Sequence, residues 1–470
     1  MTTPLWTFAE LAQATGGTFI GAGDGGVTDA HGINFDSRAL QGGDIFLALQ
    51  GARDGHDFVP AAFQAGAVVA ITRRPIAGGP CLLVPDVQRA LDDLAVFARE
   101  RASTAKRGAV TGSVGKTSVT QMVMQGLKRA GRAHSAVKSF NNHIGVPLTL
   151  ARMPADTERA VFEIGMNHAD EITPLSEFVA PHAVVITTVG AVHTENFPDG
   201  EAGVAAAKAE IFDGLLPGGL AILNADNCWF DFLAQRARGS GGLVAAFGEG
   251  AGNDAQLVSH RVDGIRAEVE GRLHGRSVRF TLAHTGRHQA LNAMASLLML
   301  EALNVDLDTS IGALEGFEAL DGRGKVVTKR FTAKNGKMAQ IVIIDESYNA
   351  NPVSMTATLA SLGARARSDG ERKIVVLTDM LELGPDEQAL HAGLAPVIAG
   401  LDIDRVYAAG PLMKALWDAL PERLKGAYAT SAAELNGPLQ EDLQSGDVVM
   451  IKGSNGSKAG LIAKTLIAAD

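Results

Sequence analysis

One segment constrains this chain more than any other: Thr111-Gly112-Ser113-Val114-Gly115-Lys116-Thr117-Ser118, here called the phosphate-binding loop. The apolar residues 108–111 before the turn predict a short strand, and residues 118–131 predict a helix. A glycine-rich turn between a strand and a helix lets backbone N–H groups face a polyphosphate, which the positive helix end also favours. Lys116 adds a charge for the outer phosphates, and the Thr117 hydroxyl is placed for Mg²⁺. The segment therefore predicts an ATP-type nucleotide site on a parallel α/β sheet.

The composition excludes several other classes of protein. A length of 470 residues suits about three domains. The net charge of -10 argues against nucleic acid as a partner, and two cysteines, Cys81 and Cys228, are too few for a disulfide framework. No apolar run reaches the roughly 18 residues of a membrane span, and the N-terminus does not read as a signal peptide. We therefore expect a cytoplasmic protein.

Three predicted strands bring polar side chains to one rim of the central sheet. The phosphate-binding loop follows the first strand, Glu163 ends a buried strand at 160–165, and His193 follows the strand at 182–190. In parallel sheets, ligands bind beyond the carboxyl ends of the strands. A hydroxyl (Thr117), a carboxylate (Glu163) and an imidazole (His193) beside a triphosphate suit Mg²⁺, although His193 alone is typical of a hydrogen-bonded loop histidine.

Other candidate residues are ambiguous when they are judged from the sequence alone. Lys208 stands among small residues, so its head can approach backbone closely, but a solvated lysine fits equally well. Asn292 opens a helix and suits an adenine edge or a plain surface amide. Ser37 and Arg38 follow a strand and form a possible phosphate fork, although these residues by themselves favour an exposed loop arginine.

The strand and helix pattern divides the chain into three parts: a small α/β domain at 1–86, a central ATPase domain at 87–321 and a C-terminal domain at 322–470. Between about 220 and 285 the pattern predicts short strands with glycine turns. The last domain alternates again and predicts a Rossmann-like, doubly wound sheet. Its expected strands lie near 341–345, 373–378, 405–409 and 447–452, and its expected helices near 354–366, 386–399, 411–419 and 457–468. The predicted fold class is thus α/β in three domains.

The order of motifs resembles the bacterial Mur ligases over nearly the whole chain. The segments that carry the resemblance are the phosphate-binding loop, Asn141–Pro147, Phe162–Asn167, Asp345–Pro352 and Asp379–Gly384. The loop 345–352 is the most discriminating of these segments, and it points to the family member that adds D-alanyl-D-alanine to UDP-N-acetylmuramoyl-tripeptide. The D-N-P-R signature of the diaminopimelate- or lysine-adding member is missing from this sequence.

The resemblance implies roles for named residues. Lys116, Lys208, Arg323 and His193 would be catalytic, with Arg323 near the γ-phosphate. Thr117, Glu163, Lys208 and His193 would hold Mg²⁺, with Lys208 as a carbamate that forms from its neutral amine and CO₂. Residues 111–118, Asn292, Arg323 and Asp345 would bind ATP, and Ser37 and Arg38 would meet the uridine-diphosphate end of the substrate.

The implied reaction is an ATP-dependent amide ligation through an acyl phosphate, by a monomer acting on small molecules in peptidoglycan precursor synthesis. A folylpolyglutamate synthase-like ligase is the alternative within the same class, and the nucleotide-sugar-like first domain argues against it. A GTPase-like switch would carry an N-K-x-D signature, which this sequence lacks. A silent scaffold would have little reason to keep every motif.

Overall fold

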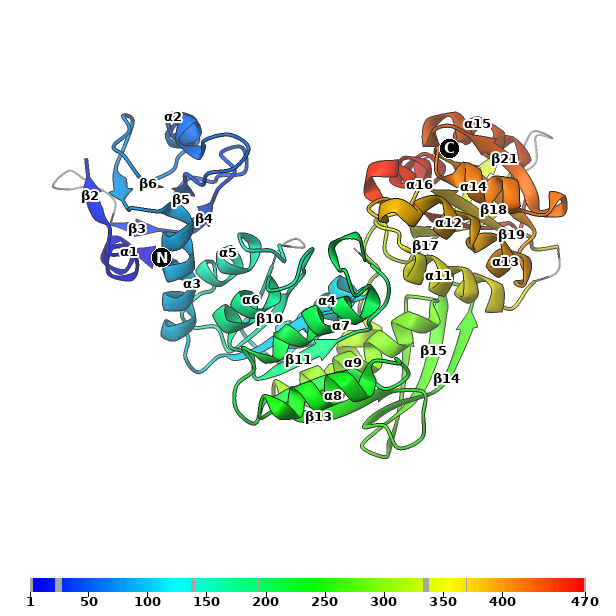
Figure 1. Ribbon diagram of the computed structural model, residues 1–470, viewed down its shortest axis with the longest axis horizontal. Helices are drawn as coiled ribbons and strands as arrows, with labels where there is room; N and C mark the ends of the chain where they lie inside the picture. The colour runs from blue at the N-terminus through cyan, green and yellow to red at the C-terminus, as the bar shows by residue number, and fades with distance from the viewer. Residues whose placement is uncertain are drawn as a thin grey trace.

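The computed structural model describes residues 3–21, 28–136, 140–192, 194–332, 338–368 and 370–468. Figure 1 shows a curved molecule in which three α/β parts follow one another in chain order, with the central part between the other two. Each part is built around a largely parallel sheet with helices against it, so the predicted α/β fold class is confirmed. Within the described residues, no helix combines the length and the apolar character needed to cross a membrane.

The N-terminal part is a small sheet flanked by short helices. Its strands run in the spatial order β2 (Thr18–Ile20), β7 (Cys81–Leu83), β6 (Val69–Thr72), β5 (Asp44–Leu47) and β4 (Gly32–Asn34), with β1 (Trp6–Thr7) paired to β3 (Asp29–Ala30) beside them. Its helices are α1 (Phe8–Thr15) and α2 (Val59–Gln64), and α3 (Val87–Arg101) leads into the central part. Thr7 caps the start of α1, where its hydroxyl and the Glu10 carboxylate form a capping box.

The central part holds the longest sheet of the described chain. Its strands run in the order β16 (Arg276–Leu282), β15 (Arg266–Leu273), β14 (Ala255–Asp263), β13 (Leu243–Gly248), β12 (Leu220–Asn224), β11 (Ala183–Ile186), β8 (Lys106–Thr111), β10 (Arg159–Glu163) and β9 (Ala133–Ser135). Strands β9 to β14 and β8 are parallel, whereas β15 and β16 continue the edge as antiparallel hairpins. The helices are α4 (Lys116–Ala130), α5 (Gly145–Ala151), α6 (Ile172–Val179), α7 (Glu201–Ala209), α8 (Phe230–Gly239), α9 (Arg287–Ala302) and α10 (Leu307–Glu315).

Both faces of the central sheet are covered because successive strand residues point to opposite sides. Ala109 of β8 packs in one core cluster with Phe162, while its neighbour Val110 packs in the other cluster with Val161. This double burial explains why these strands read as continuous apolar runs in the sequence. It also leaves the strand ends as the places where polar side chains can gather.

The C-terminal part is a second sheet covered on both faces. Its strands run in the order β17 (Lys325–Thr332), β18 (Met338–Glu346), β22 (Val448–Lys452), β19 (Lys373–Thr378), β20 (Arg405–Ala409) and β21 (Lys425–Ala429). All but the β17–β18 pair are parallel. The helices are α11 (Pro352–Ala364), α12 (Glu387–Ala392), α13 (Leu394–Ala399), α14 (Met413–Ala419), α15 (Ala432–Asp442) and α16 (Ala459–Ala468).

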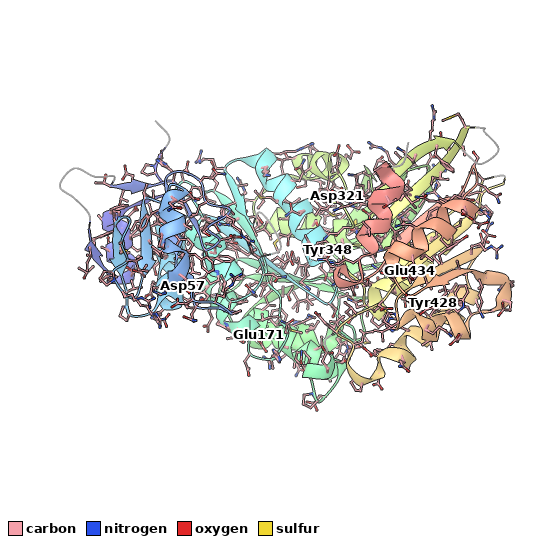
Figure 2. All side chains as sticks on the ribbon, turned by 90° about the horizontal axis from the view of Figure 1, so that it is seen from above. Asp57, Glu171, Asp321, Tyr348, Tyr428 and Glu434 are labelled. Carbon is pink, nitrogen blue, oxygen red and sulfur yellow. The ribbon has the colours of Figure 1, made fainter. Side chains whose placement is uncertain are left out.

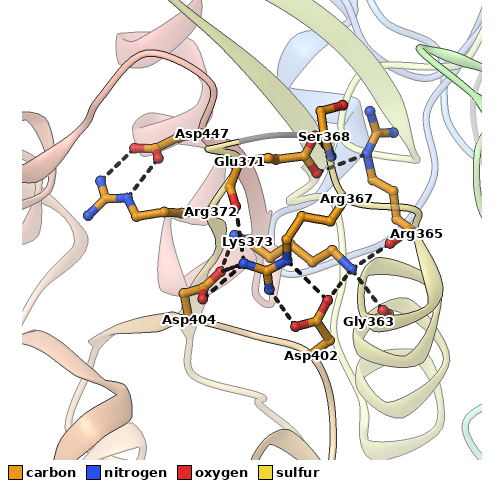
Figure 3. A network of polar contacts seen from close by, with 10 residues as sticks. All are labelled: Gly363, Arg365, Arg367, Ser368, Glu371, Arg372, Lys373, Asp402, Asp404 and Asp447. Atoms are coloured by element: carbon orange, nitrogen blue, oxygen red, sulfur yellow. Dashed lines mark hydrogen bonds and ion pairs between the residues drawn. The ribbon is translucent and has the colours of Figure 1, made fainter.

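Polar contacts at the amino end of β19 fasten the strand to the loops around it (Figure 3). The fully buried ammonium of Lys373 donates to Gly363 O at 2.9 Å and to the Asp402 carboxylate at 3.0 Å. Arg372 forms a two-pronged ion pair with Asp447, at 2.8 Å and 2.7 Å. Each buried charge therefore has an oxygen partner, which is the condition for keeping such groups in a core.

The N-terminal part and α5 share one core. Leu148 and Ala151 of α5 belong to the cluster that also holds Trp6, and the Trp6 indole donates to Ala151 O at 2.8 Å. Arg152 donates to Ile33 O at 2.8 Å across the same seam. These contacts hold the first part firmly against the central part.

Two features of the C-terminal part differ from the sequence prediction. The expected helix at 386–399 is divided into α12 and α13, which meet at Gly393. The strands β17 and β21 and the helix α15 were missing from the prediction, and α15 contains Pro438 in its interior. A glycine and a proline at 437–438 look like helix breakers, so burial of Leu435 and Leu439 had to override local preference.

Candidate active site

The phosphate-binding loop has the geometry of an anion site. Gly112 has φ +146° and Gly115 has φ +88°, and a Cβ at Gly112 would lie 1.9 Å from the Thr187 hydroxyl. Both positions therefore need glycine. Lys116 begins α4 and donates to Gly112 O at 2.7 Å, so its ammonium curls back over the loop. Burial lowers the pKa of Lys116, and the nearby charge of Arg323 adds to this effect.

Thr117 and Glu163 meet at the carboxyl ends of two neighbouring parallel strands, as the sequence predicts. The Thr117 hydroxyl donates to Glu163 Oε2 at 2.6 Å, and Asn141 Nδ2 donates to Glu163 Oε1 at 2.8 Å. Glu163 is 4% exposed. A hydroxyl and a buried carboxylate are oxygen donors of the type that Mg²⁺ prefers, so the residues present fit this ion. Asn141 fixes the orientation of the carboxylate and was not among the predicted site residues.

Lys208 lies on α7 with its amine buried, and no oxygen of the described residues is hydrogen-bonded to it. The lysine is 3% exposed, and among the described residues its recorded contact is Met166 Sδ at 4.0 Å. Burial, together with the charge of Lys116, lowers the pKa of Lys208 well below its ordinary value. A neutral amine at this position is the form that reacts with CO₂, so the environment fits a carbamate. The other predicted metal-site residue, His193, lies outside the described residues.

A cavity of about 620 Å³ lies between the central sheet and the C-terminal sheet. It is lined by Glu163, predicted to hold the metal, and by most of the predicted nucleotide residues: Ser113, Val114, Gly115, Lys116, Thr117, Ser118, Asn292 and Arg323. Thr111, Gly112, Lys208 and Asp345 are not part of its lining. The structure thus brings the predicted loop, carboxylate, amide and arginine around one space.

The C-terminal wall of this cavity contains residues that the sequence prediction missed. Glu346 and Lys452 end the adjacent strands β18 and β22, where they are direct register partners. Lys452 is 3% exposed and donates to Asn349 O at 3.0 Å, with Glu346 at 3.9 Å. Burial lowers the pKa of Lys452 and raises the pKa of Glu346. The signal in the sequence is that both residues end strands of a parallel sheet, which is where ligands bind.

Asp345 faces away from the cavity. Its Oδ2 accepts from Gly322 N at 3.0 Å, and its Oδ1 accepts from Ser347 N at 3.1 Å and from the Ser347 hydroxyl. Strand alternation explains why Glu346, and not Asp345, lines the space. The predicted contact of Asp345 with a nucleotide stays a prediction.

The predicted uridine-diphosphate residues lie in the N-terminal part, outside the lining of the cavity. The Arg38 side chain is 87% exposed and pairs with Asp36 at 2.9 Å. Ser37 lies beside it and is partly exposed. An exposed guanidinium next to a strand end remains available for an incoming phosphate, and the role of both residues stays a prediction.

Asn292 lies on α9, next to the phosphate-binding loop. It is 7% exposed, and its Nδ2 donates to Gln289 Oε1 at 3.2 Å. Its side chain packs against Gly115, where an added Cβ would lie 3.0 Å from Asn292 Oδ1. Gln289 also lines the cavity and was not predicted. The pair forms an amide-rich wall that suits the hydrogen-bonding edge of a base.

A partly buried histidine in the lining of the cavity, His288, makes stability depend on pH. Burial, then the charges of Lys452, His284 and His260, lowers the pKa of His288 to about 3. The unfolded chain, with an ordinary histidine pKa of about 6.5, therefore binds more protons than the folded chain between these values. His288 therefore leaves the free energy of unfolding nearly unchanged above pH 6.5 and lowers it as the pH drops. The loss from this histidine reaches about 2 kcal/mol at pH 5.

We expect the thermal unfolding midpoint of the wild type to fall between pH 7 and pH 5, and His288→Gln to lessen that fall. Replacement of His168, whose side chain is 62% exposed, serves as the control and should leave the wild-type pH dependence in place. An unchanged pH dependence in His288→Gln would contradict the expectation.

Comparison with known proteins agrees with this arrangement. The Mur ligase middle domain matches residues 110–300, the Mur ligase glutamate ligase domain matches 329–455, and the Mur ligase family catalytic domain matches 29–95. The UDP-N-acetylmuramoyl-tripeptide–D-alanyl-D-alanine ligase of Bacillus subtilis is 34% identical, covering 94% of this chain and 94% of the relative. The enzyme of that name from Escherichia coli is 35% identical, covering 80% and 81%.

Comparison with solved structures also finds similarity to a Mur ligase over nearly the whole chain. The crystal structure of MurF from Acinetobacter baumannii matches with a TM-score of 0.86 and 30% identity, covering 98% of each chain. Folylpolyglutamate synthase from Thermotoga maritima, the alternative ligase class, matches at 14% identity and a TM-score of 0.55, covering 80% of this chain and 93% of that one, so the likeness there is one of fold alone. Mur ligase family models match each of the three parts of the chain, and relatives above 30% identity cover most of its length. The chain therefore belongs to the Mur ligase family.

Proposed function

We propose that this chain is an ATP-dependent ligase that joins D-alanyl-D-alanine to UDP-N-acetylmuramoyl-tripeptide in peptidoglycan precursor synthesis. The observation that carries the proposal is the 620 Å³ cavity, where the phosphate-binding loop of one sheet faces the strand ends of another. Reactants held by different parts of the chain meet in such a space. The relatives named for this reaction support the choice of substrates.

The chemistry requires activation of a carboxylate, because a carboxylate does not react with an amine at neutral pH. ATP transfers its γ-phosphoryl group to the terminal carboxylate of the tripeptide, and the amine of the dipeptide attacks the acyl phosphate. The tetrahedral intermediate then expels phosphate, so no enzyme nucleophile is needed. Lys116 and Arg323 hold and neutralise the transferring group, which is the main contribution that protein residues make to phosphoryl transfer.

Thr117 and Glu163 are the proposed holders of Mg²⁺, and His193 is proposed to complete the site. When bound, the ion supplies positive charge to the phosphate oxygens. The hydrogen bond between Thr117 and Glu163 supports this assignment because it shows that both oxygens reach the same point. Asn141 keeps Glu163 oriented toward that point.

Lys208 is proposed to act as a carbamate. Its neutral Nζ attacks the carbon of CO₂ and releases one proton, which turns a buried amine into an anion with two oxygens. The burial of Lys208 and its lowered pKa support this step. The two oxygens would serve a second Mg²⁺ beside Lys116.

The remaining roles divide among the three parts of the chain. We propose that residues 1–86 hold the uridine-diphosphate end through Ser37 and Arg38, that 87–321 hold ATP, and that 322–470 receive the dipeptide. Asn292 is proposed to contact adenine, and Asp345 to meet the nucleotide from the last part. A cytoplasmic monomer without nucleic-acid partners is also proposed, and the net charge of -10 supports the last point.

The test is phosphate release by the purified protein with ATP, Mg²⁺ and UDP-N-acetylmuramoyl-tripeptide, in the presence or absence of D-alanyl-D-alanine. We expect release that depends on the dipeptide, together with a pentapeptide product of the matching mass. Phosphate release that needs glutamate and a folate would instead indicate a folylpolyglutamate synthase-like ligase. Release without any amide product would contradict ligase activity.

A further inference from the structure

The loop 321–324, which carries Arg323, is bound to the C-terminal sheet. Gly322 N donates to Asp345 Oδ2 at 3.0 Å, and Gly324 N donates to Asp345 O at 2.8 Å. In the opposite direction, Tyr348 N donates to Gly322 O at 3.0 Å. Three hydrogen bonds thus join a four-residue loop to the end of β18. Figure 2 shows Asp321 and Tyr348 where the C-terminal part meets the central part.

The Tyr348 ring lies against the Arg323 guanidinium. The guanidinium carbon lies 3.8 Å from the ring centroid, which is within the range of a cation–π contact. Both side chains line the cavity, and Tyr348 is 43% exposed. Gly322 has φ +74°, and a Cβ at this position would lie 2.9 Å from Tyr348 Cβ, so the loop and the tyrosine fit together closely.

Arg323 lines the cavity together with Lys116 of the phosphate-binding loop and Lys452 of the C-terminal wall. Burial lowers the pKa of both lysines, and the charge of Arg323 adds to that effect. The guanidinium therefore shares one cavity with a buried lysine on each wall. A long side chain at such a position loses many rotamers when it binds a phosphate, and a stacking partner that holds it in advance reduces that loss.

We propose that Tyr348 is a positioning residue that holds the Arg323 guanidinium toward the phosphate-binding loop, so that Arg323 is carried by the C-terminal sheet. The proposal rests on the proposed function, since it assigns Arg323 to the transferring phosphate. Tyr348 itself takes no part in the chemistry. Its aromatic face is the feature that acts, and its hydroxyl is not required.

The test uses Tyr348→Met, which keeps side-chain volume without an aromatic face, and Tyr348→Phe, which keeps the face. We expect Tyr348→Met to lower kcat roughly 5- to 30-fold, the strength of one partly exposed cation–π contact, with the KM for D-alanyl-D-alanine unchanged. Tyr348→Phe should recover most of that loss. Tyr428→Met is the matched control, because Tyr428 lies on β21 of the C-terminal sheet and does not line the cavity.

A double-mutant cycle decides whether Tyr348 acts through Arg323. In an Arg323→Ala background, Tyr348→Met should cause no further loss of kcat. The same fold-loss in both backgrounds would overturn the proposal and would indicate direct contact of Tyr348 with a substrate. Failure of Tyr348→Phe to recover activity would overturn it as well.

Nucleotide binding gives a readout that does not depend on the ligation. Tyr348→Met should weaken a non-hydrolysable ATP analogue more than ADP, since Arg323 is assigned to the γ-phosphate, and Tyr348→Phe should restore the difference. Equal weakening of both nucleotides would overturn the proposal. If the wild type shows no dipeptide-dependent phosphate release, the proposed ligase function fails, and this binding comparison still tests the role of Tyr348.

Discussion

Lys116→Ala is expected to lower kcat/KM for ligation by about 10³-fold, as removal of a preorganised charge from a transition state does. The ammonium is held over the phosphate-binding loop by Gly112 O at 2.7 Å, so its charge is already in position when a polyphosphate arrives. Alanine keeps the start of α4 helical, and the thermal unfolding midpoint should change little. Steady-state kinetics with all three substrates measure the effect.

Lys128→Ala is the matched control for this change. Lys128 lies on the same helix as Lys116, but in its exposed last turn. Its replacement removes one lysine charge without touching the cavity, and activity should stay near that of the wild type. A Lys116→Ala enzyme that retained more than a tenth of wild-type activity would contradict the proposed role of the loop.

Lys208→Ala is expected to lower kcat by about 10²-fold or more, since it removes the anion proposed for a second Mg²⁺. Stability should not fall, because folding buries a lysine for which the described residues offer no hydrogen-bonding oxygen. The folded pKa of the unmodified lysine lies below its unfolded value, so at neutral pH folding must remove a proton from it. Alanine removes that cost, and the unfolding midpoint should stay equal or rise.

Chemical rescue distinguishes a carbamate from a simple lysine. Acetate or formate should restore part of the activity of Lys208→Ala by supplying the missing carboxylate. Neither should restore activity in Lys208→Arg, where the arginine side chain occupies the space that alanine leaves empty. Wild-type protein in ¹³C-bicarbonate should show a carbamate resonance that Lys208→Ala lacks. Lys373, a fully buried lysine with oxygen partners, is the internal comparison and should give no such resonance. Full activity in CO₂-free buffer would contradict the carbamate.

The central part of the fold was predictable because its signals are local and strong. The glycines and Lys116 identify the phosphate-binding loop, and the continuous apolar runs of β10 and β11 identify buried parallel strands. Those two facts are enough to place Thr117 and Glu163 at one rim, where they share a hydrogen bond. Helix α15 escaped prediction because its evidence is tertiary: Leu435 and Leu439 are buried against the sheet despite Pro438.

The C-terminal wall of the site was harder to predict for a related reason. Asp345 and Glu346 are adjacent acids at the end of β18, and composition gives no preference between them. Only the pairing of Glu346 with Lys452 across β18 and β22 shows which side chain faces the cavity. Pairing between strands more than 100 residues apart is a long-range property that no local pattern contains.

The core shared by the N-terminal part and α5 joins the first two parts of the molecule by apolar packing. Leu148 and Ala151 tie α5 to the first sheet, and the segment just before α5 carries Asn141, which holds Glu163. A displacement of the N-terminal part therefore reaches Glu163, the carboxylate proposed to hold Mg²⁺, through packed side chains and one short hydrogen-bonded segment. We expect the N-terminal and central parts to move together as one rigid body. The C-terminal part, with its sheet and Arg323, would move as a second body relative to them.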